Sequence, residues 1–133
     1  MQLNSYLHFN GRCEEAFKFY EKLLGGKIEA MIPHEGTPAA EQVPAGWRKK
    51  IMHARLTVGD QVLMASDVPP GHYSPPQGFR VNISIQNPAD AERIFKALAD
   101  KGKIAMPLEK TFWAQRFGMV TDQFGIPWMI NCE

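Results

Sequence analysis

The residues that decide the fold are LNSYLHFNGRCEEAFKFYEKLLGG at positions 3–26. The first seven alternate between two faces, with Leu3, Ser5, Leu7 and Phe9 on one and Asn4, Tyr6 and His8 on the other. Such alternation is typical of a strand with one buried face. After Asn10-Gly11 the apolar residues recur at helical spacing, at Cys13, Ala16, Phe17, Tyr20, Leu23 and Leu24. The stretch therefore predicts a strand and then an amphipathic helix, ended by a left-handed residue in Gly25-Gly26.

The same order returns in the second half of the chain. Residues 79–86 alternate as a strand, and Asn87 and Pro88 are typical of the N-cap and first position of a helix. The apolar stripe at positions 13, 16, 17 and 20 recurs at 91, 94, 95 and 98, and Gly102 is expected to close the helix. Self-similarity of this kind indicates one supersecondary unit used twice.

Three strand candidates follow each helix. They are residues 27–32, 51–58 and 61–66 in the first half, and 103–106, 115–121 and 126–131 in the second. Residues 34–48 have little apolar periodicity and carry several Pro and Gly, so we expect a long loop that is mobile or gated by a ligand, with a solvated His34. The Pro-rich segment 68–78 is expected to be a linker. The sequence thus predicts one α+β domain of two tandem βαβββ modules, residues 1–67 and 79–133, whose curved mixed sheets surround a cleft.

Composition and charge exclude several classes of protein. The chain has 133 residues, 44% apolar and 22% charged, which is enough for a buried core without disulfides. With 15 basic and 14 acidic residues, the net charge of +1 does not indicate nucleic acid as a partner. The N-terminus does not resemble a signal peptide, and no apolar run reaches the roughly 18 residues of a membrane span. Cys13 and Cys132 lack metal or redox spacing, so we expect reduced thiols, a cytoplasmic location and no membrane partner.

Three further stretches carry a family resemblance. They are YLHFNG (6–11) with EEAFKFY (14–20), MHARLTVGD (52–60) with LMASD (63–67), and WAQRFG (113–118) with DQFGIPWMIN (122–131). Over nearly the whole chain they resemble the PhnB-like branch of the glyoxalase, bleomycin-resistance and dioxygenase (vicinal oxygen chelate) superfamily. The resemblance implies paired βαβββ modules and commonly a homodimer. In members with known chemistry it implies a divalent metal held by His, Glu or Gln, whereas other members sequester a drug without metal.

The resemblance also implies where a metal would be held. The positions nearest the four ligand positions are Asn4, Met64, Arg80 and Met129, and a shift of the first strand would offer Tyr6 or His8. A guanidinium cannot ligate a cation, and a thioether is a soft ligand. We therefore expect no bound metal. We expect no other cofactor either, since no Gly-rich loop joins a strand to a helix where a methyl donor could bind.

Several side chains are candidates for binding a small molecule. His8 is either a site residue or a hydrogen-bonded strand histidine, and His53 either pairs with Asp67 or bonds a loop. Arg80 would orient a carboxylate or phosphate by a bidentate hydrogen bond, unless Phe79 takes its place. Aromatic residues of the second module form either a stacking wall or packing contacts, and they are Trp113, Phe117 and Trp128. The full ligand-binding prediction is Tyr6, His8, His53, Met64, Arg80, Trp113 and Trp128, and no catalytic residue can be assigned.

Two hypotheses of function follow from these residues. The first is a metal-free homodimer that binds a small, partly apolar molecule. The second is a divalent-metal-dependent lyase, isomerase or dioxygenase that recruits His8 and His53 as ligands. A purely structural dimer module is a third possibility, since a fold alone does not determine function.

Overall fold

The computed structural model describes residues 1–133 and separates into two units, Met1–Ser74 and Pro75–Glu133. The first unit contains β1 (Ser5–Phe9), α1 (Cys13–Leu24), β2 (Lys27–Pro33), β3 (Ile51–Val58) and β4 (Gln61–Asp67). The second contains β5 (Val81–Ile85), α2 (Pro88–Ala99), β6 (Lys103–Glu109), β7 (Arg116–Thr121) and β8 (Pro127–Cys132). The α+β class and the tandem βαβββ order predicted from the sequence are confirmed, and the boundary falls inside residues 68–78.

Each unit holds one four-stranded mixed sheet. The strand order is β1-β4-β3-β2 in the first unit and β5-β8-β7-β6 in the second. β1 runs parallel to β4, and β5 runs parallel to β8, whereas all other neighbours are antiparallel. The first strand of each unit is therefore an edge strand that pairs with the last strand of the same unit.

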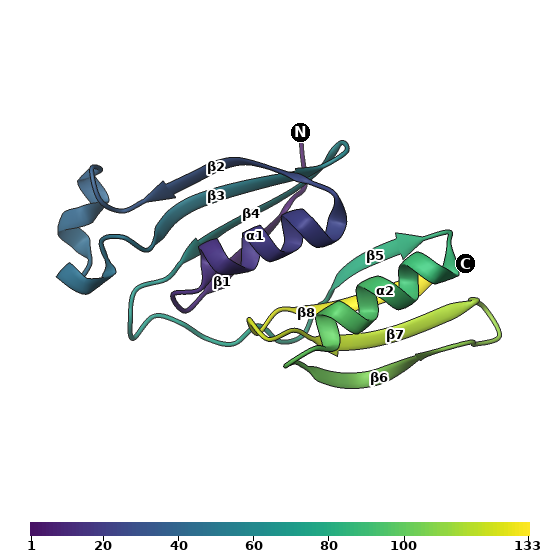
Figure 1. Ribbon diagram of the computed structural model, residues 1–133. Coiled ribbons are helices and arrows are strands. Elements are labelled where there is room, and N and C mark those ends of the chain that lie inside the picture. The colour runs from purple at the N-terminus through teal and green to yellow at the C-terminus, as the bar shows by residue number, and fades with distance from the viewer. The chain divides into compact units, whose positions relative to one another are not determined.

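One helix covers one face of each sheet (Figure 1). The core residues of the first unit include Leu7, Phe9, Cys13, Ala16, Phe17, Tyr20, Ala54, Leu56 and Ala65. Those of the second include Ala91, Ile94, Phe95, Leu98, Val120, Trp128, Ile130 and Cys132. The recurring helical stripe of both modules is therefore confirmed. The alternation of the first strand is confirmed at Leu7 and Phe9, whereas Leu3, expected on the same face, precedes β1 and is 96% exposed. We call the sheet face opposite a unit's own helix its open face, because strand alternation places the remaining side chains there.

The start of α1 is held by a carboxylate from the end of β4. Arg12 occupies the N-cap position but makes no capping bond with its side chain. Instead, Asp67 Oδ1 accepts hydrogen bonds from the backbone N–H groups of Gly11 and Cys13, both at 2.9 Å. Its Oδ2 accepts from the N–H of Ile51, also at 2.9 Å. Asp67 therefore satisfies three backbone donors that α1 and β3 would otherwise leave without a partner.

Cys13 is the first residue of α1, and its side chain is fully buried. Burial, together with the nearby negative charges of Asp67 and Glu14, raises the pKa of the Cys13 thiol far above its ordinary value. A thiol that stays protonated is a poor nucleophile and a poor metal ligand. Cys13 and Cys132 are both free and buried, as expected of reduced structural cysteines.

The two helices end differently, which corrects one detail of the sequence prediction. After α1, Gly25 adopts the left-handed conformation with φ 69°. After α2, Lys101 takes that conformation, with φ 59°, and Gly102 does not. Gly102 serves a steric purpose instead, since a Cβ there would press on the Thr121 carbonyl oxygen and lie 2.8 Å from the Leu98 oxygen.

Replacing Lys101 by glycine should stabilise the protein by about 0.5–1 kcal/mol. A left-handed L-residue carries a steric cost of roughly 1–2 kcal/mol, which exceeds the extra unfolded-state entropy of glycine. Urea unfolding followed by circular dichroism measures the change. The matched variant Gly25→Ala should show the opposite sign, because nothing lies within 4 Å of its added Cβ and only the backbone effect remains. Equal stabilities for Lys101→Gly and the parent chain would contradict the strain argument.

The segment between β2 and β3 is more ordered than the sequence indicates. It contains two 3-10 helices, Pro38–Gln42 and Ala45–Trp47. His34 is buried rather than solvated, and its Nδ1 lies 2.8 Å from the Lys50 carbonyl oxygen, which also accepts the His34 backbone N–H. The base of the loop is thus tied together, which corrects the expectation of a solvated His34. That the loop is mobile or gated by a ligand stays a prediction.

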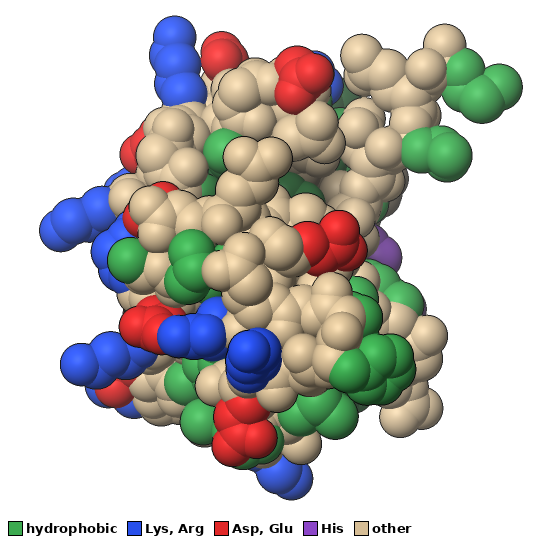
Figure 2. Space-filling view, turned by 90° about the vertical axis from the view of Figure 1, so that its right-hand side faces the viewer, with side chains coloured by type: hydrophobic (Ala, Val, Ile, Leu, Met, Phe, Trp, Pro, Cys, Tyr) green, Lys and Arg blue, Asp and Glu red, His purple; other side chains and the backbone are tan.

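Charged side chains of both signs lie on the surface of the protein (Figure 2). On the face shown in Figure 2, basic and acidic side chains are interspersed rather than gathered into a patch of one sign. Neither helix has the length and apolar character that crossing a bilayer requires.

Candidate functional site

Ring side chains gather on the open face of the first unit. Tyr6 is 42% exposed and follows the alternation of β1 away from buried Leu7. Its hydroxyl oxygen lies 3.2 Å from His53 Nδ1. The Tyr6 ring is 5.7 Å from the His8 ring in an edge-on arrangement and 5.9 Å from the His53 ring in a stacked one. One tyrosine therefore brings together two histidines from different strands.

Strand register explains how the other candidates join this cluster. Tyr6 on β1 pairs with Met64 on β4, and Met64 pairs with Arg55 on β3. Ala54, Leu56 and Ala65 are fully buried against the helix, so their strand neighbours point to the open face. We define the open-face cluster as Tyr6, His8, His53, Arg55, Met64 and Ser66. Four of its members, Tyr6, His8, His53 and Met64, were predicted from the sequence.

The hypothesis of a His53–Asp67 pair is wrong. Asp67 is 2% exposed and lies on the helix side of the sheet. Its two carboxylate oxygens accept hydrogen bonds from three backbone N–H groups. The hydrogen-bonding partner of the His53 ring is the Tyr6 hydroxyl. The pair of side chains that can share a proton here is thus an imidazole and a phenol.

The candidates of the second unit lie in different surroundings. Arg80 Nη1 is 3.3 Å from the Trp128 carbonyl oxygen and 3.5 Å from that of Val120. These bonds hold the guanidinium against its own sheet. Phe79, the alternative to Arg80, is 51% exposed. Arg80 is therefore partly engaged with the backbone before any ligand arrives.

The three aromatic residues of the second unit divide into two groups. Trp113 is 50% exposed, and its ring centroid lies 4.7 Å from that of Phe112 and 5.4 Å from that of Phe117. Trp128 is 1% exposed and donates its Nε1–H to Asp122 Oδ2 at 2.8 Å. Trp113 and Phe117 can thus offer an aromatic surface, whereas Trp128 belongs to the core and does not form a stacking wall.

The open face of the second sheet combines thioethers with amides. Met129 pairs with Asn82 on one side and with Met119 on the other. Next along β8, Asn131 donates to Glu133, but its Oδ1 is buried and has no hydrogen-bond partner. An orphaned buried acceptor is uncommon in folded proteins, and a ligand or water that donates a hydrogen bond would satisfy it.

The sequence matches a family profile over residues 2–130, and the profile describes the glyoxalase/bleomycin resistance protein/dioxygenase superfamily. The chain belongs to this superfamily. Protein YjdN of Escherichia coli K12 is 37% identical over 139 residues, covering 98% of this chain and 95% of YjdN. The resemblance inferred from the sequence motifs is therefore confirmed.

Solved structures of two other proteins share this fold. Protein PA1353 of Pseudomonas aeruginosa is 50% identical, with a TM-score of 0.91 over 100% of this chain and 98% of PA1353. The PhnB protein of Bacillus cereus, described as a putative 3-demethylubiquinone-9 3-methyltransferase, is 23% identical with a TM-score of 0.84 over the whole of both chains. At that identity the similarity to the Bacillus cereus protein establishes a shared fold.

The residues present do not fit the divalent metal that superfamily enzymes use. No group of three or more His, Cys, Asp or Glu side chains is placed so that it could hold an ion. The open-face cluster supplies two imidazoles, a phenol and a soft thioether, with the cation of Arg55 beside them. In the second unit, Arg80 and Met129 stand where the resemblance implies ligands. Affinity for such metals depends on the number and charge of hard or borderline donors, which this set lacks.

Arg55 was not included in the ligand-binding prediction, although the sequence holds a signal for it. Residues 51–58 alternate, so Arg55 shares the face of His53.

A shallow surface depression on α2 is lined by Arg93, Lys96, Ala97, Ala99 and Asp100. It includes none of the predicted site residues and suggests no chemistry.

Proposed function

We propose that this protein binds a small, partly apolar molecule on the open face of its sheets and does so without a catalytic metal. The observation that carries the proposal is the open-face cluster, in which aromatic rings and a thioether adjoin a few polar groups. Ligand sites commonly combine apolar lining with a small number of polar groups that fix orientation. The contact between exposed Trp113 and half-buried Phe117, together with the orphaned Asn131 acceptor, supports a similar role for the second unit.

The donor chemistry of the cluster favours binding over metal catalysis. Arg55 stands two strands from Tyr6, with Met64 between them. A guanidinium repels a nearby cation and lowers the metal affinity of the two histidines. An enzyme of the superfamily type would need further carboxylate or imidazole ligands to overcome this repulsion.

Purified protein without a histidine tag should contain no stoichiometric divalent metal. Titration with zinc, nickel, manganese or iron should leave its melting temperature unchanged, because too few donors converge to bind an ion. Elemental analysis and thermal unfolding make the measurement. Stoichiometric metal that resists mild chelation, and that a His8→Ala/His53→Ala variant loses, would instead favour a metal-dependent lyase, isomerase or dioxygenase.

Native mass spectrometry after incubation with a metabolite extract tests ligand binding directly. Tyr6→Ala removes the ring that joins both histidines and should reduce the bound fraction. Tyr73→Ala, in the segment between β4 and β5, is the matched control and should bind as the parent chain does. Equal binding by Tyr6→Ala and the parent chain would rule out the cluster as the site.

We expect the protein to form a homodimer of about twice its 15.0 kDa chain mass in light scattering. The second unit exposes large apolar side chains, namely Phe79, Ile104, Met106, Phe112 and Trp113. Such side chains and unpaired sheet edges favour association. Phe112→Ser/Trp113→Ser should shift the equilibrium toward monomer, and a monomeric parent chain at micromolar concentration would contradict the expectation.

We also propose a cytoplasmic location, which the two free cysteines support because disulfides are rare in that compartment.

A further inference from the structure

Arg55 is a cation without an acidic partner. It lies on β3 between Ala54 and Leu56, which are both fully buried, so its half-buried side chain points to the open face. None of the ion pairs in the structure includes it, and no hydrogen bond reaches it. A guanidinium presents five N–H donors in a planar fork. On this face those donors remain available to a ligand.

Within the open-face cluster, the neighbours of Arg55 include hydrogen-bond donors and no carboxylate. Ser66 offers a hydroxyl group, and His53 offers the ring nitrogen that Tyr6 does not use. When the Tyr6 hydroxyl donates to Nδ1 of His53, the neutral ring carries its proton on Nε2. His53 then presents an N–H on the same face and strand as the guanidinium of Arg55.

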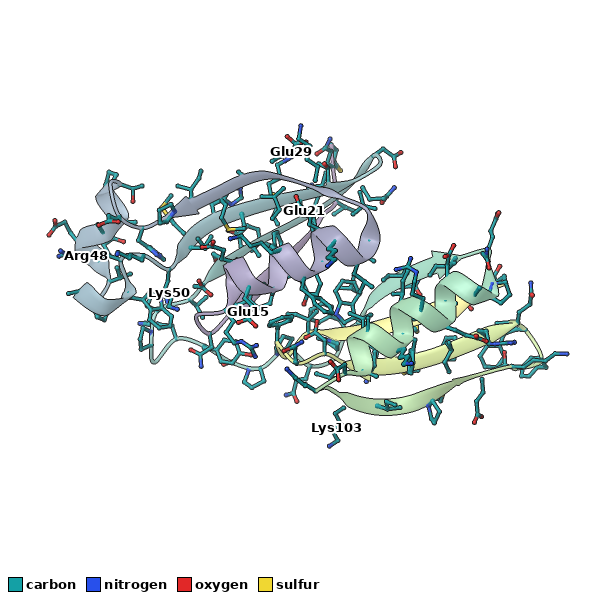
Figure 3. The ribbon with its side chains drawn as sticks, viewed as in Figure 1. Glu15, Glu21, Glu29, Arg48, Lys50 and Lys103 are labelled. Atoms are coloured by element: carbon teal, nitrogen blue, oxygen red, sulfur yellow. The ribbon has the colours of Figure 1, made fainter.

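The acid on the adjoining strand is engaged elsewhere. Glu29 projects from β2 near one end of the sheet, opposite the end where Arg48 and Lys50 lie (Figure 3). Its carboxylate accepts a hydrogen bond from the Thr57 hydroxyl at 3.3 Å. The residues of β2 that pair with Arg55 and His53 are Ala30 and Ile32, which are both apolar. The open-face cluster therefore contains a positive charge and no negative one.

From this arrangement we infer that the ligand carries an anionic group, a carboxylate or a phosphate, which Arg55 binds. The inference rests on the proposed function, because it specifies the chemistry of that ligand. Neighbouring strands are about 4.8 Å apart, so the backbones of Arg55 and Tyr6 are separated by about 10 Å with Met64 between them. A small molecule can then place its anionic end on Arg55 and its apolar body over Met64 and the Tyr6 ring.

Arg55 fits this role better than Arg80, which the sequence indicated. Arg80 Nη1 already bonds two backbone carbonyl oxygens of its own sheet. Arg55 makes no hydrogen bond that an anion would have to break, so the whole energy of the charge-assisted hydrogen bond contributes to binding. A guanidinium and carboxylate or phosphate form this contact bidentately, which also fixes the orientation of the ligand.

Isothermal titration with three probes tests the inference, namely benzoate, phenyl phosphate and the neutral benzamide. The parent chain should bind at least one anion about tenfold or more tightly than benzamide, since a hydrogen bond to a charged group contributes about 1.5–3 kcal/mol. Arg55→Gln should remove that preference, and Arg55→Lys should restore part of it. Arg48→Gln, an exposed arginine of the β2–β3 loop, is the matched control and should change nothing. The stronger of the two anions identifies carboxylate or phosphate as the preferred group.

Two outcomes would overturn the inference, and they differ in their meaning for the proposed function. Arg55→Gln could bind anions as tightly as the parent chain does, while Tyr6→Ala lowers the affinity for all three probes. In that case the cluster is a ligand site, but Arg55 does not bind the anionic group. If no probe binds saturably at millimolar concentration to the parent chain, both the inference and the proposed function fail. Circular dichroism of each variant confirms that loss of binding does not reflect unfolding.

Discussion

Asp67→Ala should lower the free energy of unfolding by about 3–5 kcal/mol. The carboxylate is 2% exposed and accepts bonds from the N–H groups of Gly11, Cys13 and Ile51. Each buried donor left without a partner costs roughly 1–3 kcal/mol, and water that enters the gap recovers part of that cost. A domain of this size is stable by only about 5–15 kcal/mol, so the variant should lose a large fraction of its stability.

Urea unfolding followed by far-ultraviolet circular dichroism measures this effect. Asp67→Asn retains one side-chain oxygen acceptor and should lose less stability than Asp67→Ala. Asp60→Ala is the matched control, because Asp60 is exposed in the β3–β4 turn and bonds only the Gln61 side chain. A loss below 1 kcal/mol for Asp67→Ala would mean that α1 does not depend on this carboxylate.

Gly102→Ala should lower the free energy of unfolding by about 3 kcal/mol. The added Cβ would meet backbone atoms of β7 and α2, including the carbonyl oxygens of Thr121 and Leu98. Backbone atoms cannot rotate away as a flexible side chain can, so the helix must shift relative to its sheet, and overpacking of this kind typically costs about 1–3 kcal/mol or more. Gly26 occupies the matching place after α1, with the Thr57 carbonyl oxygen 2.6 Å from its added Cβ. Gly26→Ala should therefore show a similar loss.

Thermal and urea unfolding of the glycine variants test this steric argument. Gly46→Ala provides the control, because nothing lies within 4 Å of its added Cβ and its φ is not positive. Its stability should match that of the parent chain. If Gly102→Ala were as stable as Gly46→Ala, the close approach of α2 to β7 would not be a constraint on this position.

Much of the fold could be predicted because its two periodicities are local. A period of two placed Tyr6 and His8 opposite buried Leu7, and the helical stripe placed Phe17 and Phe95 in the cores. These patterns depend only on neighbouring residues along the chain. The sequence therefore indicated both modules and the face on which most of the open-face cluster lies.

The remaining details depend on contacts between distant segments. Trp128 is buried because Asp122, across a turn, accepts its indole N–H, and sequence periodicity does not show where that carboxylate points. Arg80 is engaged by carbonyl oxygens of other strands, so its role could not be separated from that of Arg55. Gly102 reads as a left-handed helix terminus, whereas Thr121 on β7 imposes its small size. Long-range packing decides each of these cases.

The parallel pairing of the outer strands also bears on how the chain folds. In the strand register, Ser5 on β1 lies opposite Leu63 on β4, and Val81 on β5 lies opposite Trp128 on β8. Each sheet is therefore complete only when the last strand of its own unit has been synthesised. Non-local pairing of this kind raises the contact order and slows folding, because loop-closure entropy is lost before the contacts form. During synthesis on the ribosome, β1 must wait for β4 with its apolar face uncovered. The internal repeat then supplies a competing partner, since β8 presents the same strand pattern as β4, and exchange of β1 between modules is the misfolding route that this architecture has to avoid.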